Sequence, residues 1–490
     1  MSNLTNRRTV LRAGVAVVAV EAATTVTPGR AATAGERALA LTGVTVIDVQ
    51  GGRSRPDMTV LVEGQRITAV GRRSDVTIPA AAEIIDLPGK YVIPGLCDAH
   101  VHSIPDERIS PPLYLANGVT TVREMSGTPL LHHWRERVER GELLGPRSVI
   151  ASRIVDGAPT VGDPAMFVEV ATEAQARQAV RQAKADGADF VKVYSRLPAD
   201  LHRVVAEESR RQGIPFAGHC PDAVSPSRAS GSGQRTIEHL YSTWYDTSTR
   251  EPDLRARIAE WEISQSDVVG WLHDVHRLEW DAAGSYSARK AAAVLRTLAR
   301  NRTRVVPTLV VYEVLDRPDE IALTDEHLQF VPRPMLDGWH WAMENIIKAG
   351  RTNQESAQRH ALLDRRVEFV GELGRAGVPV LAGTDAGDVP FIIPGFSMHD
   401  ELAFLVRAGF SPLRALQSAT IEPARMLGVA DSTGTVDPGK AADLVVLDDD
   451  PLADIRNTTR IHTVVARGRR LSPEQRARML AEVAQAAAEA

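Results

Sequence analysis

Short apolar runs that end on a polar residue alternate with longer amphipathic segments through the middle of the chain. We expect eight strands in this region, near residues 92–99, 120–125, 148–154, 190–194, 216–219, 236–239, 305–311 and 380–383. Strands that alternate with helices are typical of βα units and a parallel sheet. Eight such units fit a closed (β/α)8 barrel of the TIM type. The pattern therefore predicts an α/β fold built around a barrel.

Polar residues at the expected helix starts support this alternation. Thr172 opens an amphipathic segment, and Ser411 precedes Pro412, which suits the first position of a helix. Ser397 is followed three residues later by Asp400, and this spacing predicts a capping box. We therefore interpret Asp400 as a capping residue rather than a catalytic one.

The two ends of the chain follow a different pattern from its middle. Strand-like segments separated by Gly, Pro and Asp occupy residues 39–92 and 430–471, and we expect them to form one composite β-sandwich beside a barrel of residues 93–429. Residues 243–300 carry four tryptophans and predict a helical insert, either a lid or a peripheral helical hairpin. The alanine-rich residues 472–490 predict a C-terminal helix.

Residues 1–34 have the pattern of an export signal. The segment "NRRTVLR" precedes an apolar stretch, and Ala32 and Ala34 supply the small residues of a cleavage site. This arrangement predicts a twin-arginine signal and an exported protein, periplasmic or extracellular. Glu21 interrupts the apolar stretch, so a disordered basic tail is the alternative. We expect no membrane span in the rest of the chain, because no uncharged apolar run is long enough.

Composition narrows the class of partner. The chain has 490 residues, of which 43 % are hydrophobic, enough to bury a large core. The formal net charge of −5, without a sustained basic stripe, gives no reason to expect nucleic acid, so a small molecule is the expected partner. Only Cys97 and Cys220 occur, so there is no disulfide framework, and we interpret both as buried thiols. Homo-oligomerisation is left open.

Candidate chemistry lies where the expected strands end. His100 and His102 stand two apart on a strand, so both imidazoles can face one metal ion. Lys192 alternates with Val191 and Val193 and is expected to point into the barrel. Burial lowers the pKa of an amine, and a neutral amine can be carboxylated by carbon dioxide to a carbamate that bridges two metals. A lysine paired with an acidic neighbour is the alternative.

Three further polar residues close other apolar runs. His219 ends "IPFAGH", His239 ends "RTIEH" and Asp385 lies in "VPVLAGTD". Functional groups of a parallel barrel cluster where strands finish and loops begin. Together with the histidine pair and the lysine, these residues predict a two-metal hydrolytic site.

These motifs resemble the amidohydrolase superfamily and, within it, the imidazolonepropionase-like and prolidase-like branch. The resemblance covers nearly all of the chain after the signal and rests on "VIPGLCDAHVHS", "GADFVKVYS", "GHC", "IEHL", "AGTDAG" and "GTVDPGKAADLVVLD". It implies two divalent metal ions, with zinc expected, and a carbamate formed from carbon dioxide. It further implies His100, His102 and Asp385 on the first metal, a carboxylated Lys192 as the bridge, and His219 and His239 on the second.

The resemblance also implies a reaction, the hydrolysis of an amide, peptide-like or cyclic amide C–N bond of a small molecule by a hydroxide that bridges two metals. Asp385 would move the proton, and Tyr194, unless it is only a packed barrel residue, would polarise the carbonyl. Arg153 and Arg196 are candidates for binding a substrate carboxylate, although surface positions are their default interpretation. Dipeptides and N-acyl amino acids are candidate substrates. The segment "SRLPADLH" stands where members of the branch have "GG", and this departure argues against a dipeptidase.

Two alternative functions stay open. A metal-dependent lyase or decarboxylase could use the same scaffold, because a fold does not determine a reaction. The other alternative is an exported metal-binding protein without catalysis.

Overall fold

The structure is a computed structural model, and it describes residues 37–160, 165–261, 268–322 and 326–490. The predicted signal of residues 1–34 lies outside these residues. None of the helices in the described part of the chain is long and apolar enough to cross a membrane.

Eight parallel segments form the predicted barrel. Seven of them are strands, namely β6 (Leu96–Val101), β7 (Val119–Glu124), β8 (Arg147–Ile150), β11 (Val191–Val193), β12 (Phe216–His219), β13 (Thr236–Glu238) and β14 (Arg304–Val306). Residues 380–386 complete the ring, because Leu381 N donates to Val305 O and Ala99 N donates to Ala382 O, both at 3.0 Å. Between β8 and β11, Ser152 N donates to Phe190 O at 2.8 Å. The α/β barrel fold predicted from the sequence is confirmed.

Two strands differ from their predicted lengths. The segment expected at residues 148–154 divides into β8 and a separate strand, β9 (Ile154–Gly157), which pairs with β10 (Phe167–Val170) and with β11. The strand expected at residues 305–311 ends at Val306 instead. Pro307 lacks an N–H to extend the ladder, Thr308 takes a left-handed φ of 47°, and α10 (Leu309–Asp316) begins directly afterwards.

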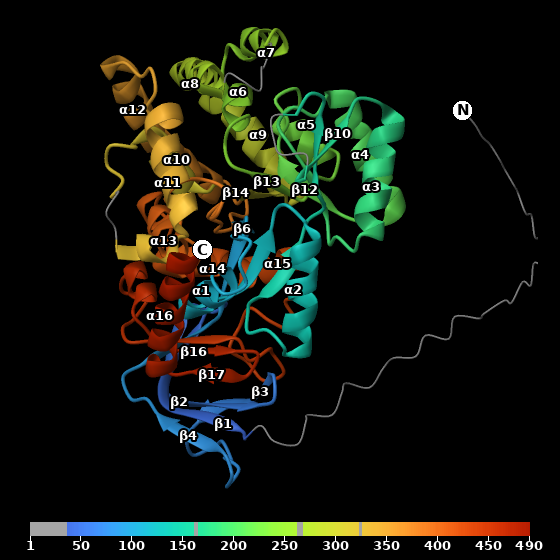
Figure 1. Cartoon of the computed structure of the whole chain (residues 1–490). Helices are drawn as coiled ribbons and strands as arrows, with labels where there is room; N and C mark the ends of the chain where they lie inside the picture. The colour runs from blue at the N-terminus through green and yellow to red at the C-terminus, as the bar shows by residue number, and fades with distance from the viewer. Residues whose placement is uncertain (1–36, 161–164, 262–267, 323–325) are drawn as a thin grey trace, which may run out of the picture. The chain divides into compact units, whose positions relative to one another are not determined.

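Helices follow the barrel strands and surround them (Figure 1). Those that alternate with the strands are α1 (Ser110–Ala116), α2 (Pro129–Arg140), α3 (Glu173–Ala185), α4 (Ala199–Gln212), α5 (Pro226–Gly231), α13 (Ser397–Arg407), α14 (Pro412–Ser418) and α15 (Ile421–Leu427). Thr172 and Ser411 cap α3 and α14 as predicted, each accepting a backbone N–H with its hydroxyl. The capping box predicted at Ser397 is wrong, because Phe396 holds the cap position and the Ser397 hydroxyl accepts instead from Ile393 N at 2.9 Å.

Strands from both chain ends form one sheet that folds over its own core. Its order is β17 (Arg469–Leu471), β16 (Ile461–Ala466), β15 (Leu444–Leu447), β5 (Tyr91–Pro94), β1 (Leu39–Asp48), β2 (Arg53–Glu63) and β3 (Arg66–Arg72), with β4 (Glu83–Asp86) beside β1. Leu41, Val60, Val92 and Val446 are among the buried residues that meet inside it. Figure 1 shows the first strands in blue beside β16 and β17 in red.

Two helical segments, rather than one, interrupt the barrel. The first follows β13 and contains α6 (Thr243–Thr247), α7 (Glu251–Ala259), α8 (Val268–Gly284) and α9 (Ala288–Asn301). The second follows β14 and contains α10, α11 (Arg333–Ala342) and the long α12 (Asn353–Arg375).

Near the chain end, α16 (Pro473–Glu489) packs through Val483 and Ala487 in a cluster with Ile104 and Leu113.

Candidate metal centre

The residues predicted as metal ligands line one cavity at the carboxyl ends of the barrel strands. The cavity has a volume of about 450 Å³. Each ligand candidate lies on a barrel strand, directly after one, or in the parallel segment of residues 380–386, and together they are His100, His102, Lys192, His219, His239 and Asp385. Parallel strands bring these positions together although they are up to 285 residues apart in sequence.

Asp385 lies among three of the histidines. Its Oδ1 atom is 3.0 Å from His100 Nε2 and 3.3 Å from His102 Nε2, and its Oδ2 atom is 3.8 Å from His239 Nε2. The rings of His219 and His239 stand edge to face with centroids 4.7 Å apart. The carboxylate and the imidazoles therefore converge on the same space.

Each of the four histidines is oriented through its other ring nitrogen. His100 Nδ1 forms a hydrogen bond with Glu238 Oε2 at 3.0 Å. The Nδ1 atoms of the other three histidines form hydrogen bonds with hydroxyl groups. These pairs are His102 with Ser126 at 3.0 Å, His219 with Ser195 at 2.7 Å and His239 with Thr308 at 2.7 Å. Such partners fix the ring orientation and leave Nε2 for a metal. Glu238 in turn pairs with Arg123 at 3.1 Å. Burial alone would raise the pKa of Glu238, but Arg123 and His100 hold it well below its usual range.

Three residues at this centre have a strained backbone. His239 has φ of 61°, Asp385 has 65° and Thr308, the partner of His239, has 47°. Residues other than glycine rarely adopt this left-handed region, and such strain persists where the surrounding structure enforces it for a functional geometry. Here it directs two ligand candidates and one supporting hydroxyl into the cavity.

The donor set fits divalent metal ions. His100 Nε2 and Asp385 Oδ1 are fully buried and form no hydrogen bond of good geometry with any described residue, although they face each other. Burial lowers the pKa of His239 to about 3 and that of His219 well below its usual value, so both imidazoles are neutral, as metal ligands must be. Neutral imidazole nitrogen and carboxylate oxygen are the ligands of zinc and similar ions.

Lys192 points into the same cavity. It is 1 % exposed, and it forms no ion pair with a carboxylate among the described residues. Burial lowers the pKa of its amine to about 8, with the more distant Glu238 and Asp385 opposing that shift. Near neutral pH a fraction of this amine is therefore uncharged, which carboxylation requires.

Asp388 is a candidate ligand that the sequence analysis missed. Two groups of three residues each have their ligand atoms within 4.8 Å of one another. One group is His100, His239 and Asp385, and the other is His102, Asp385 and Asp388. His239 thus shares a group with His100, whereas the sequence analysis assigned it to the other metal with His219. Asp388 follows Asp385 by three residues in "AGTDAGD", and its position in the loop after the last strand was the available signal.

The structure separates the other predicted site residues. Tyr194 lines the cavity, with its ring 4.0 Å from that of His219, and burial raises the pKa of its hydroxyl well above the usual value. Arg153 is exposed and lines a different hollow beside α3. Arg196 lies outside the cavity lining and donates to Pro159 O at 2.6 Å. The two predicted substrate arginines are therefore not part of this site.

The two helical segments supply the walls of the cavity. Trp271, Leu272 and Val275 line it from α8, and Tyr312 lines it from α10. Arg366 of α12 also reaches it, where it pairs with Glu279 and Asp316. Tyr241, two residues after His239, completes an aromatic wall. Sequence patterns placed a helical insert here but gave no signal for these individual contacts.

The amidohydrolase family pattern matches residues 91–471 of the chain. The protein belongs to the amidohydrolase family. This amidohydrolase is 24 % identical to a dihydroorotase from Pelotomaculum thermopropionicum, across 88 % of this chain and 95 % of the relative. It is 23 % identical to an imidazolonepropionase from Pseudomonas putida, across 81 % and 89 %. The solved structure of a bottromycin amidohydrolase matches with a TM-score of 0.72 and 25 % identity, across 93 % of this chain and 91 % of the other. The predicted family is confirmed.

Proposed function

We propose that this amidohydrolase hydrolyses an amide, peptide-like or cyclic amide C–N bond of a small molecule with two divalent metal ions, zinc in the first instance. The observation that carries the proposal is the convergence of four imidazoles, one carboxylate and one buried amine on a single cavity. Named relatives such as dihydroorotase and imidazolonepropionase support the C–N bond class. We also propose, from residues 1–34 alone, that the protein is exported by the twin-arginine route.

The protein side chains have distinct roles in this proposal. When bound, the metals would act as Lewis acids that make water a nucleophile near neutral pH. Asp385, in reach of three imidazoles, accepts the proton of that water and delivers it to the leaving nitrogen. Tyr194 keeps its O–H because burial raises its pKa, so it can donate a hydrogen bond to the scissile carbonyl oxygen.

The cavity walls favour an apolar or aromatic group next to the scissile bond. Tyrosine and tryptophan side chains line much of the cavity, and its two arginines, Arg359 and Arg366, are already paired with Glu355 and with Glu279 and Asp316. Aromatic side chains supply large apolar contact areas. N-acyl aromatic amino acids, aromatic dipeptides and lactams are therefore the first substrates to examine.

We expect the zinc-loaded protein to hydrolyse at least one member of such a panel. Removal of the metal with a chelator should abolish turnover, and added zinc should restore it, because the proposed nucleophile depends on the metals and because His100 Nε2 and Asp385 Oδ1 lack hydrogen-bond partners of good geometry among the described residues. Product formation is followed by mass spectrometry and metal content by elemental analysis. Two bound metals without hydrolysis of any panel member would contradict the proposal.

Lys192→Ala is expected to lose at least one metal per chain and about 100-fold or more in turnover, because the proposed carbamate bridge cannot form. Added acetate or propionate should restore part of both, since a free carboxylate can occupy the bridging position. Lys184→Ala is the matched control, because Lys184 is an exposed lysine of α3. A Lys192→Ala protein that retains both metals would rule out the bridge.

A further inference from the structure

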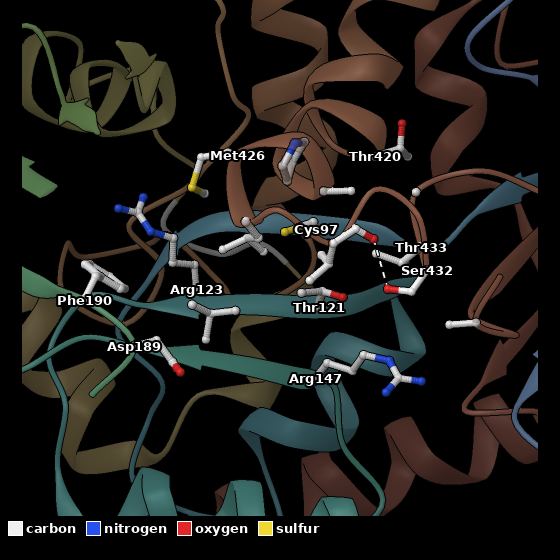
Figure 2. Close-up of a pocket in the computed structure, with 18 of the residues that line it drawn as sticks. Cys97, Thr121, Arg123, Arg147, Asp189, Phe190, Thr420, Met426, Ser432 and Thr433 are labelled. Atoms are coloured by element: carbon white, nitrogen blue, oxygen red, sulfur yellow. Dashed lines mark hydrogen bonds between the residues drawn. The ribbon is translucent and has the colours of Figure 1, made fainter. Parts of the chain in front are cut away.

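A second and larger cavity lies at the opposite end of the barrel. Its volume is about 700 Å³, compared with about 450 Å³ for the metal-facing cavity. Cys97, Thr121, Arg147 and Phe190 line it where β6, β7, β8 and β11 begin (Figure 2). Residues of α15 and of the loop after it form the other side, including Met426, Ser432 and Thr433.

Small inward side chains explain the hollow. Thr121, Val149 and Ala217 line it from β7, β8 and β12. Larger residues at such positions would fill the end of the barrel, as is usual in this fold. Protein interiors are close-packed, with few voids larger than a water molecule. A hollow of several hundred cubic ångströms instead has the size of a small-molecule site.

The cavity has an apolar floor and a basic rim. Phe190, Ala217 and Met426 are buried, and burial raises the pKa of the Cys97 thiol to about 12, which keeps it neutral. Arg66 and Arg235, by contrast, are exposed at the rim, and neither forms an ion pair with a carboxylate of the described residues.

The remaining charges at the cavity are already paired. Arg147 bonds Asp443 at 2.7 Å, and Asp189, the one acidic group among the described lining residues, bonds Arg135 at 2.7 Å. Arg66 donates to Gly439 O at 2.7 Å, but neither Arg66 nor Arg235 has a carboxylate partner among the described residues. Their two charges therefore give the mouth of the cavity a positive potential.

A wall of buried charges separates this cavity from the metal ligands. Arg123 lines the cavity, its guanidinium stacks 4.5 Å above the Phe190 ring, and it pairs with Glu238 at 3.1 Å. Glu238 then bonds His100 Nδ1 at 3.0 Å. A molecule in this second cavity, called the lower cavity below, would meet the Arg123–Glu238 ion pair before it could reach the metal-ligand candidates. The lower cavity is therefore not an extension of the proposed catalytic site.

We propose that this cavity is a second binding site, for a small amphipathic carboxylate. Its apolar chain would lie against Phe190 and Met426, and its carboxylate would meet Arg235 at the rim. Guanidinium groups bind carboxylates with charge-assisted hydrogen bonds, and burial of a hydrocarbon chain supplies the remaining affinity. The site requires neither catalysis nor bound metal, so its test is independent of the proposed reaction.

The probe is octanoate, titrated by calorimetry into the metal-loaded full chain. We expect one octanoate per chain, with 1-octanol and acetate each binding at least about tenfold more weakly, since one lacks the charge and the other the chain. Arg235→Gln should weaken octanoate binding about tenfold, whereas Arg210→Gln, at an exposed position of α4 outside the cavity, should leave it unchanged.

Two further variants locate the bound octanoate. Val149→Trp fills the lower cavity and should abolish binding, whereas Tyr241→Ala enlarges the metal-facing cavity and should not change it. Any of three results would overturn the proposal: absence of octanoate binding, equal affinity for 1-octanol, or sensitivity to Tyr241→Ala together with indifference to Arg235→Gln. Arg235 is exposed, so its variant remains informative if Val149→Trp fails to fold.

Discussion

Asp385→Asn is expected to lower turnover of the best panel substrate by about a thousandfold, within the range of general acid–base catalysis. The amide is nearly the same size as the carboxylate, but it cannot accept and return the proton. It also presents a neutral oxygen to the atoms that Asp385 now faces, His100 Nε2 at 3.0 Å and His102 Nε2 at 3.3 Å. We expect a fall in kcat larger than any change in KM, measured in steady-state assays at matched metal content.

Asp388→Asn is the matched control for this substitution. Asp388 lies three residues further along the same loop, and its ligand atom lies within 4.8 Å of those of His102 and Asp385, but its side chain is exposed, whereas Asp385 is buried and lies near three histidines. Its loss should weaken metal binding more than it lowers kcat of the fully loaded enzyme. If Asp385→Asn retains turnover within tenfold of the parent protein while Asp388→Asn does not, the proton-transfer role belongs to Asp388.

The strand-end residues could be predicted because one physical rule governs all of them. A buried barrel strand is a run of apolar residues, and the first polar side chain after it lies at the functional end of the barrel. His219 follows this rule directly, His239 comes one residue after the polar Glu238, and Lys192 is conspicuous because a lysine is costly inside a strand. The rule depends only on local sequence, so no knowledge of distant contacts was needed.

The supporting contacts could not be predicted in the same way. His239 is oriented by Thr308, 69 residues later, and His100 by Glu238, 138 residues later. Such pairings depend on how separate strands are staggered around the barrel, which no single segment records. Thr308 was moreover placed inside an expected strand, and its left-handed backbone, which ends β14, has no clear signature in a non-glycine residue.

The two candidate substrate arginines do not line the metal-facing cavity. Both follow strands, as the ligand candidates do, but Arg153 stands between β8 and β9 and lines a different hollow, and Arg196, after β11, donates to Pro159 O. The arginines that do reach the cavity, Arg359 and Arg366, come from α12, which is far from any strand end. In a barrel with long insertions, the walls of the site are set by tertiary packing of helices rather than by the strand rule.

Arg366→Met is expected to destabilise the folded protein by about 3–5 kcal/mol, the usual cost of removing one partner of a buried ion pair. Arg366 is 2 % exposed and joins Glu279 of α8, at 2.6 Å, to Asp316 of α10. Its guanidinium also stacks 4.1 Å above the Tyr312 ring. Without the cation, two buried carboxylates face each other across the wall of the metal-facing cavity. Chemical denaturation should show the loss as a lower midpoint.

The pH dependence identifies the cause of this loss. Burial raises the pKa of Glu279 to about 7 from its usual 4.5 even though Arg366 opposes the shift, so removal of Arg366 should raise it further. A carboxyl with a raised folded-state pKa favours the folded protein while it is protonated, and that contribution is lost as the pH rises through the folded pKa. The Arg366→Met defect should therefore be smaller at pH 5 than at pH 8.

Two comparisons separate charge from packing in this experiment. Arg375→Met, at an exposed position of the same helix, should change stability by less than about 0.5 kcal/mol. The triple variant Arg366→Met, Glu279→Leu, Asp316→Leu should recover much of the lost stability, because an apolar cluster of similar volume can replace a buried ion network. A triple variant as unstable as Arg366→Met would mean that α8, α10 and α12 depend on the shape of the arginine rather than on its charge.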